Sequence, residues 1–103
     1  MKFVVMSVWD VGKAAELSKL ADKVDAAPPS GYKVLARYVC LAQPVSGLPL
    51  GTRVSIEIVE AESADAIAAA SYPSMLAGAD INTVPVIDIP IGGVAEVEKK
   101  ARG

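Results

Sequence analysis

The sequence contains no histidine and only one cysteine, Cys40. Without histidine the chain lacks the commonest general base, the usual zinc ligand and the partner of serine and cysteine triads. A single cysteine excludes an internal disulfide and a cysteine-rich metal site, which fits a reducing compartment. We therefore expect no metal ion and no cofactor, and we interpret Cys40 as a small buried hydrophobe.

A clear excess of one charge is also missing. Ten basic and twelve acidic residues are dispersed along the chain and give a net charge of −2, and the aromatic residues are one Trp, three Tyr and one Phe. A nucleic-acid-binding surface needs clustered Lys and Arg to neutralise phosphates. The composition therefore argues against nucleic acid as a partner.

Long uninterrupted apolar runs are absent too. A membrane span needs roughly 20 such residues, whereas Pro and Gly interrupt the longest uncharged stretches, "YVCLAQPVSGLPLGT" and "AIAAASYPSMLAGA". The start, "MKFVVMSVWD", is followed by Lys13 and by no small-residue cleavage site, which favours a strand over a signal peptide. We expect a cytoplasmic protein with no membrane as partner.

What the chain has in excess is hydrophobicity. Apolar residues make up 52% of its 103 residues, and the mean hydropathy is +0.40. A chain of this length forms one domain with a limited interior, so part of this apolar surface needs another protein chain to cover it. We expect that partner to be a second copy, in a homodimer or a higher homo-oligomer.

The first half of the chain has the pattern of strand, helix, strand. "KFVVMSVW", residues 2–9, is apolar on both faces and predicts a central strand. Asp10 is placed to cap a helix that ends near Ala26, before "AAPPSG". Residues 32–43 and 52–61 predict a hairpin joined by the turn-rich "PVSGLPLG".

The hairpin has a preferred register. Alternation of side chains favours Arg37 opposite Glu57 and Tyr38 opposite Ile56. This register separates a mixed face from an apolar face, which contains Val34, Ala36, Tyr38, Cys40, Val54, Ile56 and Ile58.

A second strand-to-helix change occurs in "VEAESADAIAAA", residues 59–70. There the period of two stops and Ser63 is placed to cap a helix, which Pro73 is expected to kink or end near Tyr72 before a final stop at Gly78. Residues 81–91 predict a last strand, and its two prolines place it at a sheet edge. The tail, residues 92–103, has a helical pattern from Val94.

This order, β-α-β-β-α-β, is the ferredoxin-like α+β arrangement, with an antiparallel sheet in the order 4-1-3-2 and two helices on one face. With "KFVVMSVW", "VEAESADAIAAA" and "NTVPVIDI", residues 1–91 resemble the dimeric α+β barrel superfamily, and most of all its small single-domain members of unassigned function. The resemblance implies a homodimer in which the uncovered sheet faces pack together.

Members of that superfamily include cofactor-independent monooxygenases, haem-degrading enzymes, lactone isomerases and ligand-binding regulatory domains. The chain lacks the histidine that the haem-degrading members use. No catalytic residue of the superfamily can be carried over to this sequence.

Five residues are candidates for a ligand site: Ser7, Trp9, Arg37, Glu57 and Tyr72. Trp9 can stack on a flat ligand or anchor the core or the dimer interface, and Ser7 on the same strand face can donate to a ligand. Arg37 can bind a carboxylate while Glu57 serves as a base, or the two form an ion pair within or across protomers. Tyr72 can donate its phenol or simply pack its ring.

These residues support two functional hypotheses. The first is a non-catalytic ligand-binding or interaction module. The alternative is a cofactor-independent enzyme, of the monooxygenase or isomerase type, that acts on a small hydrophobic or aromatic substrate by positioning it. A purely structural subunit of a larger assembly is a third reading.

Overall fold

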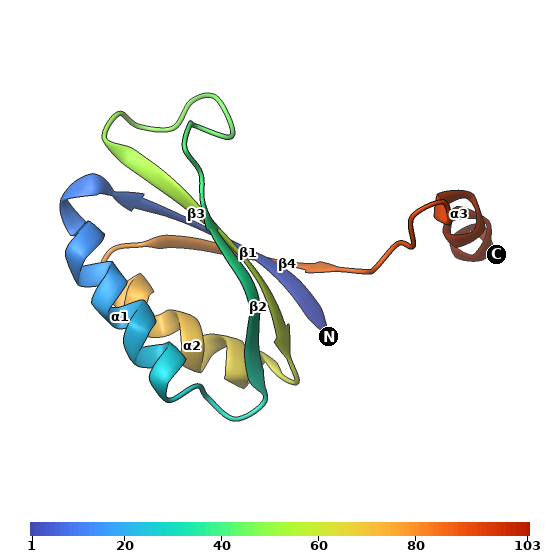
Figure 1. Ribbon diagram of the computed structural model, residues 1–103, viewed down its shortest axis with the longest axis horizontal. Coiled ribbons are helices and arrows are strands. Elements are labelled where there is room, and N and C mark those ends of the chain that lie inside the picture. Colours follow the sequence, from blue (N-terminus) through green and yellow to red (C-terminus); the bar gives the residue numbers. More distant parts are fainter.

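The computed structural model describes residues 1–103 and has an α+β fold (Figure 1). Two helices cover one side of a four-stranded antiparallel sheet, and a third helix lies apart. In chain order the elements are β1 (Lys2–Asp10), a 3-10 turn (Val11–Lys13), α1 (Ala14–Ala26), β2 (Tyr32–Val39), β3 (Thr52–Ala61), α2 (Ala64–Leu76), β4 (Asp80–Val86) and α3 (Val94–Arg102). None of these helices is both long enough and apolar enough to cross a membrane.

The strand order across the sheet is β2-β3-β1-β4, and counted from the opposite edge this is the order 4-1-3-2. The apolar β1 is central, with β3 and β4 as antiparallel neighbours. The proline-bearing β4 lies at an edge, where a missing backbone N–H leaves no ladder bond unmade on the outer side.

The predicted hairpin register is confirmed around its centre, where Arg37 lies opposite Glu57 and Tyr38 opposite Ile56. A bulge between Val34 and Ala36 then shifts the register, so that Val34 pairs with Val59. The prediction that Val34 shares the apolar face with Ala36 is therefore wrong, because one extra residue in a strand moves every side chain beyond it to the other face.

Strand β2 is shorter than predicted and ends at Val39 instead of residue 43. The Cys40 amide still donates to the Val54 carbonyl at 2.8 Å. Beyond it the Gln43 side chain, Nε2, donates to the Thr52 carbonyl at 3.3 Å, which takes that acceptor away from a backbone ladder. The chain therefore leaves the sheet early.

Both predicted caps are present. The Asp10 carboxylate accepts from the Gly12 amide at 2.7 Å and caps the 3-10 turn that leads into α1. The Ser63 hydroxyl accepts from the Ala66 amide at 3.1 Å and starts α2. Each satisfies an amide that has no partner inside its helix.

Helix α2 does not end near Tyr72, which was one of the two outcomes predicted for Pro73, and runs through the proline to Leu76. Pro73 has no N–H, so one helical hydrogen bond is lost. The Ala77 amide donates to the Pro73 carbonyl at 3.2 Å, which keeps the turn that follows the proline. The C-cap is Ala77, and the next residue, Gly78, stops the helix with a φ of 103° that is readily adopted only by glycine.

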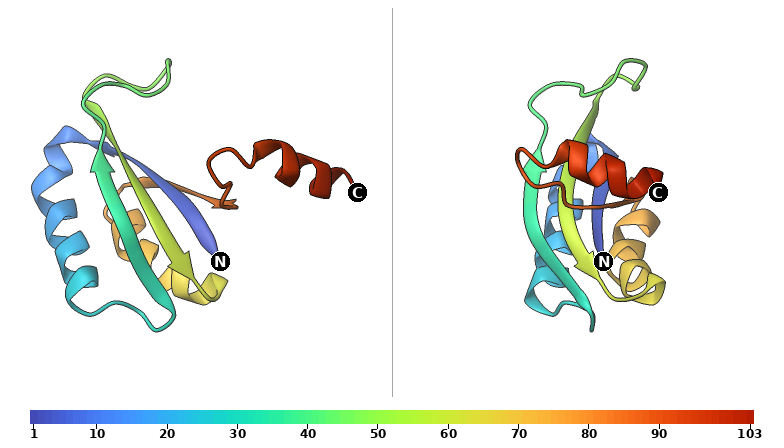
Figure 2. Two further views of the ribbon diagram at one scale, coloured as in Figure 1. Left: turned by 45° about the vertical axis from the view of Figure 1, so that its right-hand side comes forward. Right: turned by 90° about the vertical axis from the view of Figure 1, so that its right-hand side faces the viewer.

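Strand β4 is also shorter than predicted and ends at Val86, not residue 91. Val86 lies opposite Lys2, the first residue of β1, so the residues after it have no neighbouring strand. From there the chain leads away from the sheet to α3, as Figures 1 and 2 show.

The two faces of the sheet are covered very unequally. Only seven of the 103 residues are buried, and six of them are Val or Ala. Helices α1 and α2 cover the face that contains Arg37 and Glu57. The other face, which we call the open face, has no helix over it and contains Val4, Met6, Val8, Ala36, Tyr38, Ile56, Ile58 and Val84. The more apolar face is thus the uncovered one.

Candidate ligand cavity

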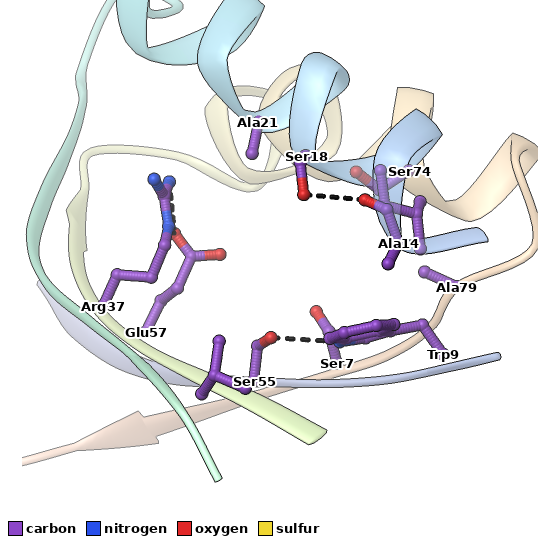
Figure 3. Close-up of a pocket in the computed structure, with 12 residues that line it drawn as sticks. Ser7, Trp9, Ala14, Ser18, Ala21, Arg37, Ser55, Glu57, Ser74 and Ala79 are labelled. Atoms are coloured by element: carbon purple, nitrogen blue, oxygen red, sulfur yellow. Dashed lines mark hydrogen bonds and ion pairs between the residues drawn. The ribbon is translucent and has the colours of Figure 1, made fainter. Parts of the chain in front are cut away.

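A cavity of about 190 Å³ lies between the sheet and the two helices (Figure 3). Trp9, Leu17 and Val39 supply apolar walls, and Arg37 and Glu57 lie at one end. Four serine hydroxyls also line it, those of Ser7, Ser18, Ser55 and Ser74. The cavity is therefore neither a dry packing defect nor a purely polar cleft.

Trp9 reaches the cavity because of strand alternation. It lies on β1 on the same face as Ser7, and Ser7 lies opposite Ser55 on β3. The indole Nε1 donates to the Ser55 hydroxyl at 3.0 Å. This hydrogen bond satisfies the polar end of the indole and fixes its ring as a wall of the cavity.

The serine hydroxyls differ in their freedom to bind a ligand. Ser18 donates to the Ala14 carbonyl one turn earlier, at 2.7 Å. Ser55 accepts from Trp9, so its own proton is free for another acceptor. The hydroxyls of Ser7 and Ser74 face the cavity and can both donate and accept.

Arg37 is held by two carboxylates from two other elements. Its guanidinium forms a paired contact with Asp25 of α1, through Nη1 at 2.7 Å and Nη2 at 3.0 Å. It also donates to Oε2 of Glu57 on β3, from Nε at 3.2 Å and Nη2 at 3.0 Å. The side-chain hydrogen bond from Arg37, followed by its charge, lowers the pKa of Asp25, while the same bond raises the pKa of Arg37.

This ion pair is one of the two readings of Arg37 and Glu57 that the sequence left open, and it forms within one protomer. Four of the five Arg37 N–H groups are already used, and two carboxylates face one guanidinium. The cluster of Asp25, Arg37 and Glu57 therefore has a net charge of −1, which disfavours a carboxylate ligand. The second oxygen of Glu57 points into the cavity without a protein partner (Figure 3).

Tyr32 borders the same cluster. Burial raises the pKa of its phenol to about 12, and the negative charge of Glu57 adds to the effect. Tyr32 thus stays neutral near pH 7 and adds no charge. No three His, Cys, Asp or Glu side chains come together as a metal site.

The structure brings four of the five candidate residues together at this cavity: Ser7, Trp9, Arg37 and Glu57. Tyr72 does not line it and is 56% exposed on α2. Ser71 is buried and Ser74 lines the cavity, so the residue after Ser71, about 100° further round an unbroken helix, points outward.

Asp25 was not among the residues predicted from the sequence, because a carboxylate at the end of a helix is usually exposed to solvent. Its spacing carried a usable signal, since Asp25 continues the helical stripe of Ala14 and Ala21, both of which line the cavity. That stripe faces the sheet.

No family model matches the chain, and no curated protein matches it significantly.

Proposed function

We propose that the protein is a non-catalytic binding module that holds a small single-ring ligand in the cavity beside Trp9 and acts as a homodimer. The observation that carries the proposal is the cavity itself, with an aromatic wall on one side and unpartnered polar groups on the other. Small-molecule pockets are usually lined in this way, by apolar and aromatic side chains together with a few polar groups.

The volume of the cavity limits the ligand. A cavity of about 150 Å³ is enough for benzene. The 190 Å³ here therefore suits one ring with one or two substituents.

The charges around the cavity limit the ligand further. The Asp25, Arg37 and Glu57 cluster has an excess carboxylate, and the free oxygen of Glu57 is an acceptor. A ligand with a hydroxyl or amino donor finds a partner there, whereas an anionic ligand meets a like charge across a half-buried site. We therefore propose a neutral or cationic ring compound.

The single tryptophan provides a direct test. In ¹H-¹⁵N correlation spectra the Trp9 indole gives one signal, and this N–H lies at the cavity wall. We expect phenol and benzylamine at about 1 to 10 mM to shift it, with benzoate weaker by about tenfold or more. No shift with any of the three, or tighter binding of benzoate than of benzylamine, would contradict the proposal.

Matched variants locate the binding. Trp9→Ala removes the wall and should weaken benzylamine binding by about tenfold, followed through backbone amides near the cavity. Tyr72→Ala, which lies outside the cavity, should leave the affinity unchanged. Equal affinities for both variants would place the ligand elsewhere.

The homodimer is supported by the uncovered apolar face and by the exposed area. A compact protein of 10.6 kDa exposes about 5,500 Å², and this chain exposes 7077 Å². The excess is about twice the ~800 Å² that one partner buries in a standard interface. A second copy packed on the open face would cover the side chains that the helices leave exposed.

One observation favours the enzyme alternative, namely the Glu57 oxygen that faces the cavity. A carboxylate beside a bound ligand can act as a general base and remove a proton from a carbon next to the ligand's carbonyl group. Under this alternative the wild type catalyses deuterium exchange from a bound carbon acid, tested with a phenylacetaldehyde-type probe, and Glu57→Gln abolishes the exchange while keeping benzylamine binding within about tenfold. No protein-dependent exchange by the wild type would leave the binding module as the sole candidate.

A further inference from the structure

The chain after β4 forms an arm, residues 87–103, that projects from the body (Figures 1 and 2). Its first contact is an ion pair between Asp88 and Lys2 at 2.8 Å, which holds the base of the arm beside the start of β1. From there the arm leads away from the sheet and from α1 and α2. Its own body therefore does not cover it.

The extended part of the arm has the pattern of a strand without a partner. Ile87, Ile89 and Ile91 alternate with Asp88 and Pro90, and all three isoleucines are exposed. Strand β1 cannot pair with them because it begins at Lys2, opposite Val86. An exposed apolar segment of this kind is suited to packing on another chain.

Helix α3 also lacks support. It has nine residues, and helices shorter than about 12 to 15 residues are marginal in water unless they pack on something. Val94, Val97 and Ala101 form a stripe at helical spacing, while the charged residues of the helix and Ala95 occupy the rest of the surface. The sequence of α3 thus specifies an apolar face that has nothing beneath it in the protomer.

The protomer is more extended than a compact chain of the same length. The radius of gyration is 15.5 Å, whereas a compact chain of about 100 residues has about 13 Å. The arm belongs to every copy, so in a symmetric dimer two arms and two bodies offer reciprocal contacts. We therefore take a second copy of this chain as the partner of the arm, because no other protein has to be assumed.

We propose that the arm of one protomer packs on the body of a second copy, with Ile89, Ile91 and Val94 as its apolar contacts, in a reciprocal exchange between the two. This proposal rests on the homodimer proposed above and adds the arm to its interface. The Asp88 and Lys2 ion pair fixes the point where each arm leaves its own body.

Isotope-filtered spectra of the full-length protein test the exchange directly. A dimer mixed from ¹³C-labelled and unlabelled protomers should give intermolecular NOEs from the methyl groups of Ile89, Ile91 and Val94. A full-length Ile91→Asp/Val94→Asp variant should raise the dimer dissociation constant by about tenfold or more, measured by analytical ultracentrifugation. Ala95→Asp, which adds one charge off the apolar stripe of α3, should change it by less than about twofold.

The outcomes separate the two proposals. A dimer without NOEs from the arm, and with an unchanged dissociation constant in the double variant, overturns the exchange and leaves the homodimer standing. A full-length chain that stays monomeric at about 500 µM overturns both. Arm NOEs together with a weakened double variant support the exchange.

Discussion

Ile56→Asp is expected to convert the proposed homodimer into a monomer. Ile56 lies opposite both Met6 of β1 and Tyr38 of β2, which places it at the centre of the open face. A carboxylate buried there would have no cationic partner, and burying an unpaired charge costs several kcal/mol. We therefore expect the dimer dissociation constant to rise by about 100-fold or more.

The measurement is the molar mass by light scattering over a dilution series. Ala69→Asp is the matched control, because it adds the same charge on the exposed surface of α2. The monomeric Ile56→Asp chain should keep its circular dichroism spectrum, since the open face of a protomer is in contact with solvent. A variant that dimerises as tightly as the wild type would exclude this face as the interface.

Arg37→Met is expected to have the largest effect on the stability of a protomer. The substitution leaves Asp25 and Glu57 on two elements without the cation that joins them. Removing one partner of a fully buried ion pair costs about 3 to 5 kcal/mol, but Arg37 is 34% exposed and solvent screens the remaining charges. We therefore expect a loss of about 1 to 2 kcal/mol in the free energy of unfolding.

Urea denaturation of Arg37→Met and of Asp25→Asn/Arg37→Met measures this loss. Removing the Asp25 charge as well should restore part of the stability, because one carboxylate then no longer lacks a partner. Lys23→Met removes an exposed cation of α1 and should leave the stability within about 0.5 kcal/mol. Equal losses for Arg37→Met and Lys23→Met would show that the cluster does not hold α1 to the sheet.

The cluster of Asp25, Arg37 and Glu57 also makes the stability of the protein depend on pH. The pKa of Asp25 is lowered in the folded protein, so the folded state binds fewer protons than the unfolded state below about pH 5. Its contribution is present above the ordinary value of 3.8 and is lost as the pH falls through the lower pKa of the folded state. Asp25→Asn should flatten the loss of stability between about pH 5 and pH 3, and an unchanged slope would contradict the assignment.

Local sequence was sufficient for the elements and for part of the cavity. Ser63 caps α2 because its hydroxyl lies three residues before the amide it serves, and that relation needs no tertiary contact. Ser7 and Trp9 share a face because strand alternation places them there. The Arg37 and Glu57 pair followed from hairpin register in the same way.

Tertiary structure decided where the strands end and which residues complete the cavity. β4 stops at Val86 because its neighbour β1 begins at Lys2, and no pattern within residues 81–91 reports the length of another strand. The bulge before Ala36 moves Val34 to the other face, since the two strands of the hairpin differ locally in length.

Asp25 belongs to the cluster because the folded chain places the last turn of α1 within hydrogen-bond distance of Arg37 on β2. Cap, period and turn act over a few neighbouring residues, so the sequence determines them by itself. Strand length, choice of covered face and the meeting of charges from three elements depend on contacts far apart in the chain, and only the folded structure decides them.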